Sequence, residues 1–276
     1  MPELPEVETV CRGLAEALIG RKLVRVIANR PNLRFPLPND LGQRLIGNSI
    51  SAVKRRAKFI LIEMRTSDVL IAHLGMSGRF RIYQNTPPPE NTHDHVIFET
   101  ESGSVIRYND PRRFGFFDLT SRDDLAENRF LSDLGPEPLE NTFTPDVFIK
   151  HIKSRKTSLK AALLDQHIVA GLGNIYACEA LFMARLSPRR KTHTVGPKRA
   201  TALVDAIKTV LANAIAQGGS SLRDHRKTNG ELGYFQHTLQ VYGQENKACP
   251  RCGIGYQITR INQSGRSTFF CPHCQR

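Results

Sequence analysis

Four cysteines near the carboxyl end of the chain have the spacing of metal ligands. They form two Cys-x-x-Cys pairs with eighteen residues between them, and their positions are Cys249, Cys252, Cys271 and Cys274. The first ten residues carry three acids and no cationic stretch, which is not the pattern of a secretory signal, so disulfides are not expected. The two pairs therefore predict one structural Zn²⁺, because four sulfurs fill a tetrahedral site and leave no position for substrate.

The second residue is a proline that could act as a nucleophile. Initiator methionine is readily removed before a small residue, so we expect the mature chain to begin with the secondary amine of Pro2. An α-amino group titrates near roughly 7.7–8.0 against about 10.4 for lysine, so much more of it is unprotonated at neutral pH. Attack by this amine on a sugar aldehyde carbon gives a cationic iminium, which acidifies neighbouring C–H bonds and enables elimination.

Two acids follow this proline closely. Glu3 is next in the chain and could transfer protons at the same carbon, and Glu6 lies about one helical turn further on. The spacing alone also fits a simpler interpretation, in which Pro2 has no special role and the acids interact with the positive end of a helix. Both interpretations stay open on these residues alone.

The overall charge points to a polyanionic partner. The chain has 276 residues with 39 Lys and Arg against 26 Asp and Glu, a net charge of +13. A surplus of this size on a folded protein is most often used to bind nucleic acid. A hydrophobic content of 40% is enough for real cores, and no stretch approaches the ~18 apolar residues of a membrane span. We therefore expect a soluble cytoplasmic protein that does not bind membranes.

Hydrophobic periodicity divides the chain into unlike parts. Residues 5–19 predict an amphipathic helix, and from about 22 to 119 short runs rich in Val, Ile and Phe predict a sandwich or barrel of mostly antiparallel strands. Residues 135–139 have the composition of a linker. Four helices are expected after it, at about 145–153, 157–165, 174–185 and 197–217, the third with Asn174 as its N-cap.

The remaining segments complete the expected domain organisation. Residues 220–235 are polar, charged and rich in glycine, which is typical of a loop, and the cysteine-bearing unit follows from about 245. The fold class is therefore α+β and multidomain. We expect an N-terminal helix plus β-sandwich over 2–134, a helical domain with its loop over 135–235, and a zinc ribbon over 240–276.

Six segments, taken together, resemble one enzyme family. They occur in order along nearly the whole chain: MPELPEVETV at the start, KRRAK at 54–58, HLGMSG at 73–78, NDPRRFG at 109–115, GLGNIYACE at 171–179, and the two cysteine pairs. This combination is similar to that of the formamidopyrimidine-DNA glycosylases. The resemblance implies a helix-two-turn-helix domain between the sandwich and the ribbon. It also implies a repair enzyme that excises oxidised purines, such as 8-oxoguanine, from duplex DNA and then cleaves the strand.

The resemblance assigns roles to the residues that match the family's motifs. Pro2 is implied to form the Schiff base at C1′ of the sugar, and Glu3 to act as acid and base. Lys58 matches a lysine that donates a proton and contacts phosphate. Arg266 matches an arginine that binds the phosphates around the lesion and assists δ-elimination. Without the resemblance, the basic run around Lys58 would indicate a solvated edge before a strand.

Further matching residues are implied to contact DNA. Met76, Arg112 and Phe114 resemble the residues that fill the void left when a nucleotide is rotated out of the base stack, and we call them the void-filling set. Phosphate contacts are implied for three more residues, which are His93, Lys156 and Asn174. The residues that would read the damaged base are expected within 218–235 and are not identified. The implied enzyme works as a monomer with structural zinc and no other cofactor.

Two other functions fit parts of the sequence. An endonuclease VIII-like enzyme would favour oxidised pyrimidines, but that branch typically opens with PEGPE, whereas this chain has PELPE at residues 2–6. A non-catalytic zinc-ribbon DNA-binding protein would explain the charge and the cysteines. It would not explain the PELPE opening or Lys58.

Overall fold

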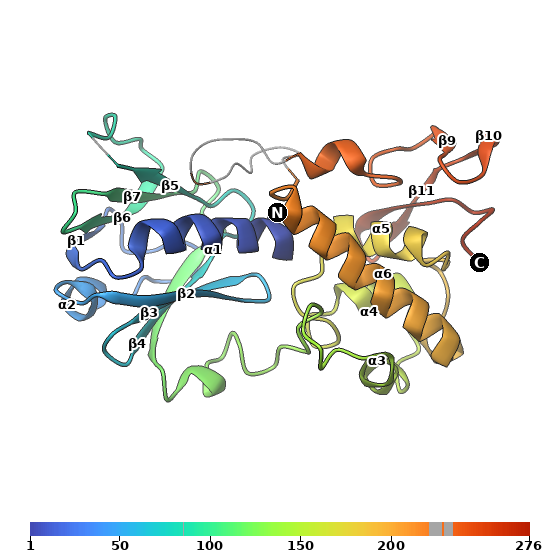
Figure 1. The fold of residues 1–276 in the computed structure, drawn as a ribbon, viewed down its shortest axis with the longest axis horizontal. Helices are drawn as coiled ribbons and strands as arrows, with labels where there is room; N and C mark the ends of the chain where they lie inside the picture. The colour runs from blue at the N-terminus through green and yellow to red at the C-terminus, as the bar shows by residue number, and fades with distance from the viewer. Residues whose placement is uncertain (85, 221–227, 229–233) are drawn as a thin grey trace. The chain divides into compact units, whose positions relative to one another are not determined.

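The computed structural model of the chain describes residues 1–84, 86–220, 228 and 234–276 (Figure 1). The chain forms two compact units. The first joins Met1–Ser132 with Gln217–Tyr234, and the second joins Asp133–Ala216 with Phe235–Arg276. Within the described residues, no helix combines the length and apolar character needed to span a bilayer.

The first unit is a sandwich of two four-stranded sheets with one long helix, α1 (Leu4–Leu18). One sheet has the order β1 (Leu23–Ala28), β6 (Asp94–Thr100), β7 (Val105–Asn109) and β5 (Arg79–Tyr83). The other has the order β2 (Ile50–Arg56), β3 (Phe59–Met64), β4 (Asp68–His73) and β8 (Phe116–Ser121). All of these strand pairings are antiparallel, which confirms the predicted sandwich.

The core of this unit forms from apolar side chains on the facing sides of the two sheets and on one face of α1. Val7, Val10 and Leu14 of α1 lie in the same buried cluster as side chains from both sheets, including Ile60, Leu70, Phe80, Val96 and Phe98. Burying a side chain of this kind contributes roughly 1.5–3 kcal/mol. The short helix α2 (Leu41–Leu45) closes one side with Leu41 and Leu45, which belong to the same cluster.

Several elements of the first unit differ from the sequence prediction. Strands β2 and β8 and helix α2 were not expected as separate elements. The basic run at 54–58 precedes β3 and is only partly a solvated edge: Lys54 is exposed near the end of the edge strand β2, whereas Ala57 and Lys58 are buried in a two-residue turn into β3. Ala57 takes a positive φ of 53°, a backbone conformation that disfavours side chains with a Cβ, so this turn is held by its surroundings.

The second unit contains the four expected helices and a small ribbon. The helices are α3 (Pro145–Ile152), α4 (Leu159–Leu164), α5 (Asn174–Met183) and α6 (Pro197–Ala216). The ribbon is built from two hairpins, β9 (Ala248–Cys249) with β10 (Gly253–Gln257) and β11 (Thr259–Gln263) with β12 (Arg266–Phe270). Short 3-10 turns at Leu125–Glu127, Thr192–Thr194 and Phe235–Thr238 complete the described elements.

Two local expectations in this unit were wrong. Gly173, and not Asn174, is the N-cap of α5, because Gly173 has the extended backbone and Asn174 is already the first helical residue. Residues 135–139 are not a free linker, since Gly135 N–H donates to the carbonyl of Gln166 at 2.8 Å and the carbonyl of Pro136 accepts from Ala170 N–H at 3.1 Å. The segment belongs to the second unit and starts its fold.

A half-buried histidine at the end of β4 makes the stability of the first unit depend on pH. His73 stacks on Phe116, with ring centroids 5.2 Å apart, and its Nδ1 accepts the N–H of Gly75 at 3.0 Å. Burial, and after it the nearby cations Lys58 and Arg34, lower the pKa of His73 to about 4. The folded state therefore holds this imidazole neutral.

We predict that the free energy of unfolding falls as the pH drops from 6.5 toward 4. In that window the unfolded chain binds a proton at His73 and the folded chain does not, which removes about 2–3 kcal/mol by pH 4.5. Denaturant titrations at pH 7 and pH 4.5 measure this difference. His73→Gln should reduce the pH dependence by that amount, and an unchanged pH dependence in the variant would contradict the prediction.

Candidate active site, metal centre and nucleic-acid interface

The amino end of the chain is buried and held in one position. Pro2, Glu3 and Glu6 are all buried, whereas Met1 is 50% exposed. Glu3 is the N-cap of α1, and the Glu6 carboxylate accepts the N–H of Glu3 at 2.8 Å. This bond occupies one of the donors that a helix start leaves without intrahelical partners. Removing the exposed Met1 would leave the imino nitrogen of Pro2 at a fixed site.

Helix α1 and strand β2 bring Glu3 and Lys58 to the same end of the sandwich. The two elements contact each other along their length, first where Gly20 N–H donates to the carbonyl of Ile50 at 2.9 Å. Further along, the Cys11 thiol donates to the carbonyl of Lys54 at 3.5 Å, and Arg55 Nε donates to Glu8 at 3.0 Å.

These contacts run in opposite directions along the two elements, so the start of α1 lies at the end of β2 (Figure 1). Lys58 follows directly after that end. It is only 7% exposed, although a lysine in a tight turn is ordinarily solvated. The first unit therefore gathers a buried cation and a buried acid beside the terminal proline, which is the composition that iminium chemistry needs.

The segment after α6 also reaches the amino end. Ser220 N–H donates to the second oxygen of the Glu6 carboxylate at 2.8 Å, and a Cβ on Gly219 would lie 3.0 Å from that oxygen. Further along, the carbonyl of Thr228 accepts the N–H of Ile82 in β5 at 3.2 Å. Most of the loop expected to read the lesion, residues 221–227 and 229–233, lies outside the described residues.

The void-filling set lies on two neighbouring turns of the first unit. Met76 is 36% exposed and Phe114 is 45% exposed, and both are therefore more open than core side chains. The guanidinium of Arg112 lies 5.1 Å from the centre of the Phe114 ring, which is within the range of a cation–π contact. The structure thus places an exposed aromatic ring and a guanidinium in contact with each other, and their roles toward DNA stay predictions.

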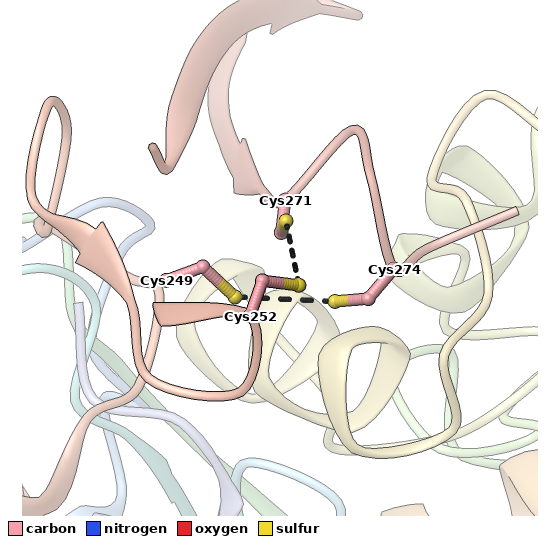
Figure 2. Close-up of side chains that lie close together, drawn as sticks. All are labelled: Cys249, Cys252, Cys271 and Cys274. Atoms are coloured by element: carbon pink, nitrogen blue, oxygen red, sulfur yellow. Dashed lines mark hydrogen bonds between the residues drawn. The ribbon is translucent and has the colours of Figure 1, made fainter. Parts of the chain in front are cut away.

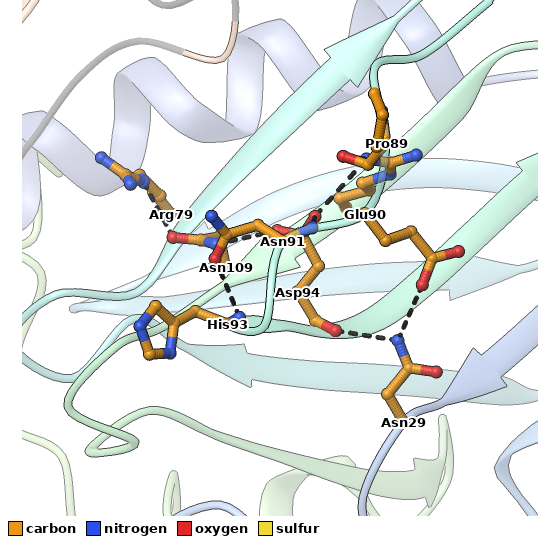
Figure 3. Close-up of polar contacts among 9 residues, drawn as sticks. Asn29, Arg79, Pro89, Glu90, Asn91, His93, Asp94 and Asn109 are labelled. Atoms are coloured by element: carbon orange, nitrogen blue, oxygen red, sulfur yellow. Dashed lines mark hydrogen bonds and ion pairs between the residues drawn. The ribbon is translucent and has the colours of Figure 1, made fainter.

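His93 lies on a turn that a buried carboxylate organises (Figure 3). Asp94 accepts from Asn91 N–H at 2.9 Å and from the side-chain amide of Asn109 at 2.8 Å, and it forms an ion pair with Arg107 at 3.5 Å. His93 itself is exposed, and its N–H donates to the Asn91 side chain at 3.0 Å. The His93 imidazole therefore faces solvent, while the turn that carries it is held by the hydrogen bonds of Asp94 and Asn91.

The second unit carries the other predicted nucleic-acid contacts. Lys156 is exposed between α3 and α4. Arg266 is exposed at the tip of the β11–β12 hairpin, where Ser264 and Gly265 take φ values of 51° and 71°, typical of a two-residue type I′ turn. The side-chain amide of Asn174 donates to the carbonyl of Ser267 at 2.8 Å. Asn174 therefore joins the start of α5 to the strand that begins with Arg266.

Sequence reasoning missed a buried acid of α5 that holds the segment before the ribbon. The Glu179 carboxylate accepts the backbone N–H groups of Gln240, Val241 and Tyr242 at 2.8–3.0 Å. Burial raises the pKa of Glu179, and the three donors oppose that shift by stabilising the charged form. In the sequence, Glu179 is only the last residue of the segment GLGNIYACE. Its structural role has no local signal, because its partners lie 61–63 residues further along the chain.

The four predicted metal ligands meet in one cluster (Figure 2). Their sulfurs all lie within 4.8 Å of one another, with Cys249 to Cys274 at 3.9 Å and Cys252 to Cys271 at 3.8 Å. A tetrahedron with Zn–S bonds of about 2.3 Å has sulfurs about 3.8 Å apart, whereas a disulfide needs about 2.05 Å. The cluster fits a structural zinc ion and excludes paired disulfides in this arrangement.

Each unit holds its own part of the predicted site. The first unit carries Pro2, Glu3, Lys58, Met76, His93, Arg112 and Phe114. The second carries Lys156, Asn174, Arg266 and the four cysteines. Cys11 and Cys178, the two cysteines outside the metal cluster, are both buried in apolar clusters.

Comparisons with known proteins cover the whole chain. The family model of the formamidopyrimidine-DNA glycosylase N-terminal domain matches residues 1–117, that of its H2TH domain matches residues 134–226, and that of a zinc finger found in FPG and IleRS matches residues 246–276. Formamidopyrimidine-DNA glycosylases of Rhodopseudomonas palustris (strain TIE-1) and Ruegeria pomeroyi are 51% and 50% identical, each over 100% of both chains.

Solved structures agree with these relatives. A Lactococcus lactis FPG mutant in complex with DNA containing Fapy-dG has a TM-score of 0.91 at 36% identity, over 100% of both chains. The Lactococcus lactis Fpg with abasic-site DNA has a TM-score of 0.90 at 34% identity, again over 100% of both chains. These similarities, together with a buried Pro2, a two-sheet sandwich and a four-cysteine ribbon, show that the chain belongs to the formamidopyrimidine-DNA glycosylase family.

Proposed function

We propose that this base-excision repair glycosylase removes oxidised purines from duplex DNA and cleaves the abasic strand through Pro2. The observation that carries the proposal is the amino end of α1, where Pro2 and Glu3 are buried, Glu6 fixes the first turn, and the buried Lys58 lies at the same end of the sandwich. Glycosylase and lyase chemistry are properties of the family to which the chain belongs.

The proposed chemistry uses the chain's own groups at each step. The Pro2 nitrogen forms a bond to C1′ as the bond from C1′ to the damaged base breaks, and Glu3 transfers protons as the base leaves and the sugar ring opens. The resulting iminium draws electrons, so a proton leaves C2′ while the bond from C3′ to its phosphate oxygen breaks. In a second elimination a proton leaves C4′ while the bond from C5′ to its phosphate oxygen breaks, so the second phosphate departs. Lys58 donates a proton and contacts phosphate, and Arg266 holds the phosphates around the lesion during the second elimination.

The exposed cations and the void-filling set account for binding. His93, Lys156 and Arg266 contact phosphates, and the start of α5 at Asn174 contributes backbone donors facing the DNA backbone. Met76 and Phe114 enter the stack when the nucleotide is extruded, while Arg112 hydrogen-bonds the orphaned base. We further propose that the enzyme acts as a monomer with three domains over 2–134, 135–235 and 240–276, holding one zinc ion.

Zinc removal is predicted to weaken DNA binding before it affects the chemistry. The ribbon has a small core in which Cys249 and Cys271 pack with Val241, Ile258 and Phe269, so loss of the metal should unfold the hairpin that carries Arg266. Cys249→Ser should lower affinity for abasic duplex at least tenfold, and metal analysis of the parent protein should find one zinc per chain. Cys11→Ser, outside the cluster, is the matched control. Normal affinity with an unfolded ribbon would contradict the prediction.

Replacement of the terminal proline is predicted to separate binding from cleavage. Pro2→Thr keeps a small second residue but lacks the secondary amine, so it should lose strand cleavage and borohydride trapping while its DNA affinity changes by less than about tenfold. Pro5→Ala changes a proline of the same helix turn and should retain trapping. Cleavage by Pro2→Thr at the parent rate would refute the assignment.

Substrate preference distinguishes the proposal from the endonuclease VIII-like alternative. Excision rates should be measured on duplexes with 8-oxoguanine opposite cytosine and on duplexes with thymine glycol. We expect the purine lesion to be released faster, because the opening of the chain and the separate positions of Met76 and Arg112 match the purine branch. Solved structures of the Lactococcus lactis relative include one with DNA containing an oxidised pyrimidine, so relative rates decide the question. Preference for thymine glycol would reject the purine assignment.

A further inference from the structure

One buried carboxylate contacts both turns that carry the void-filling set. These turns, residues 74–78 and 110–115, are called here the two void-filling loops. Asp110 begins the second loop and is fully buried at 0% exposure. The mechanism proposed above gives it no chemical role. A buried acid is expected to be fully hydrogen-bonded, and the partners of this one show what it holds.

The carboxylate of Asp110 links the first loop to the second. Its Oδ1 accepts the hydroxyl of Ser77 in the first loop at 2.5 Å, and its Oδ2 accepts the N–H of Gly115 in the second loop at 2.8 Å. The Ser77 oxygen in turn accepts the N–H of Arg112 at 3.1 Å. The Ser77 hydroxyl, on the residue next to Met76, thus connects the Asp110 carboxylate to the backbone of Arg112.

The backbone of Asp110 holds the second loop to the sheet beneath it. Its N–H donates to the carbonyl of His93 at 3.0 Å, and its carbonyl accepts from His95 Nε2 at 2.9 Å and from Arg113 N–H at 3.2 Å. Arg113 takes a positive φ of 59°, a conformation that persists only where the surroundings impose it. The shape of the loop between Arg112 and Phe114 therefore depends on these bonds.

Close backbone packing leaves little freedom for either loop. Gly75 has a φ of +59°, and a Cβ there would lie 2.3 Å from the Phe114 carbonyl carbon and the Gly115 nitrogen. Beneath both loops lies Tyr108, whose hydroxyl donates to Oδ2 of Asp110 at 3.3 Å and would lie within about 2.2 Å of a Cβ on Gly78. The two void-filling loops therefore pack closely against each other, and the Asp110 carboxylate forms hydrogen bonds to both.

We propose that Asp110 is a positioning residue that makes Met76, Arg112 and Phe114 enter the base stack as one rigid unit. The proposal rests on the void-filling role given to these residues above. Filling the void must offset the cost of unstacking the nucleotide, and each side chain that becomes ordered only on binding would reduce that gain. A prearranged unit avoids this loss, and it also fixes the guanidinium that meets the orphaned base.

The test compares steps that need void filling with a step that does not. Asp110→Asn keeps the shape of the side chain but replaces one acceptor with a donor, so it cannot accept from both Ser77 and Gly115. Ser77→Ala removes the link between the loops and leaves Asp110 bound to Gly115. Tyr108→Phe is the matched control, because it removes a donor to the same carboxylate and keeps the link.

We expect Asp110→Asn and Ser77→Ala to lower single-turnover excision of 8-oxoguanine opposite cytosine about tenfold or more. Cleavage of a preformed abasic duplex should stay within about threefold of the parent rate, because no base remains to be extruded. The preference for cytosine over adenine opposite the lesion should shrink, since Arg112 loses its fixed position. Tyr108→Phe should stay within about twofold in both assays.

A double-mutant cycle with Met76→Ala separates this proposal from the function on which it rests. If Asp110 acts through the loops, the combined variant should be little slower than the slower single variant. Additive losses of excision rate in the combined variant would overturn the positioning role. Equal losses in excision and in abasic cleavage would also overturn it. So would unchanged excision in Asp110→Asn and Ser77→Ala. If Met76→Ala and Phe114→Ala both excise at the parent rate, the void-filling assignment itself fails.

Discussion

The arrangement of the first turn of α1 is the constraint on which the rest of the account depends. A nucleophile at the end of a chain is ordinarily mobile, and a helix start leaves several N–H groups without intrahelical partners. Here the Glu6 carboxylate accepts the N–H of Glu3 with one oxygen and the N–H of Ser220 with the other. The same side chain therefore fixes the residue beside Pro2 and the beginning of the 217–234 segment. This carboxylate therefore helps to set the position of Pro2.

Buried carboxylates that accept backbone N–H groups recur at each part of the proposed site. Glu6 holds the amino end, Asp94 holds the turn of His93, Asp110 holds the two void-filling loops, and Glu179 holds the segment before the ribbon. A bond from an N–H to an ionised acceptor is stronger than one between neutral groups, and it leaves no orphaned donor inside the fold. The protein thus fixes its loops with acids, while the residues proposed to contact DNA are exposed cations and exposed apolar side chains.

The sequence predicted the elements and residues whose signals are local. The helix periodicity, the cysteine spacing and the sandwich of short strands were confirmed by the structure. Strand β2 was missed because Arg55 looks solvent-exposed in the sequence, whereas its charge is paired with Glu8, 47 residues away. The N-cap of α5 was wrong because the Asn174 amide bonds Ser267, 93 residues away. The structural roles of Asp110 and Glu179 were not predicted for the same reason, because their hydrogen-bond partners include residues of other elements.

The identity of the residue that bonds to the sugar tests the central claim most directly. The enzyme should be incubated with duplex DNA containing 8-oxoguanine, reduced with borohydride, digested and analysed by tandem mass spectrometry, with the intact mass measured beforehand. The account predicts a chain without Met1 and a deoxyribose remnant on the nitrogen of Pro2. A remnant on Lys58 or another lysine, or a trapped chain that still carries Met1, would contradict it.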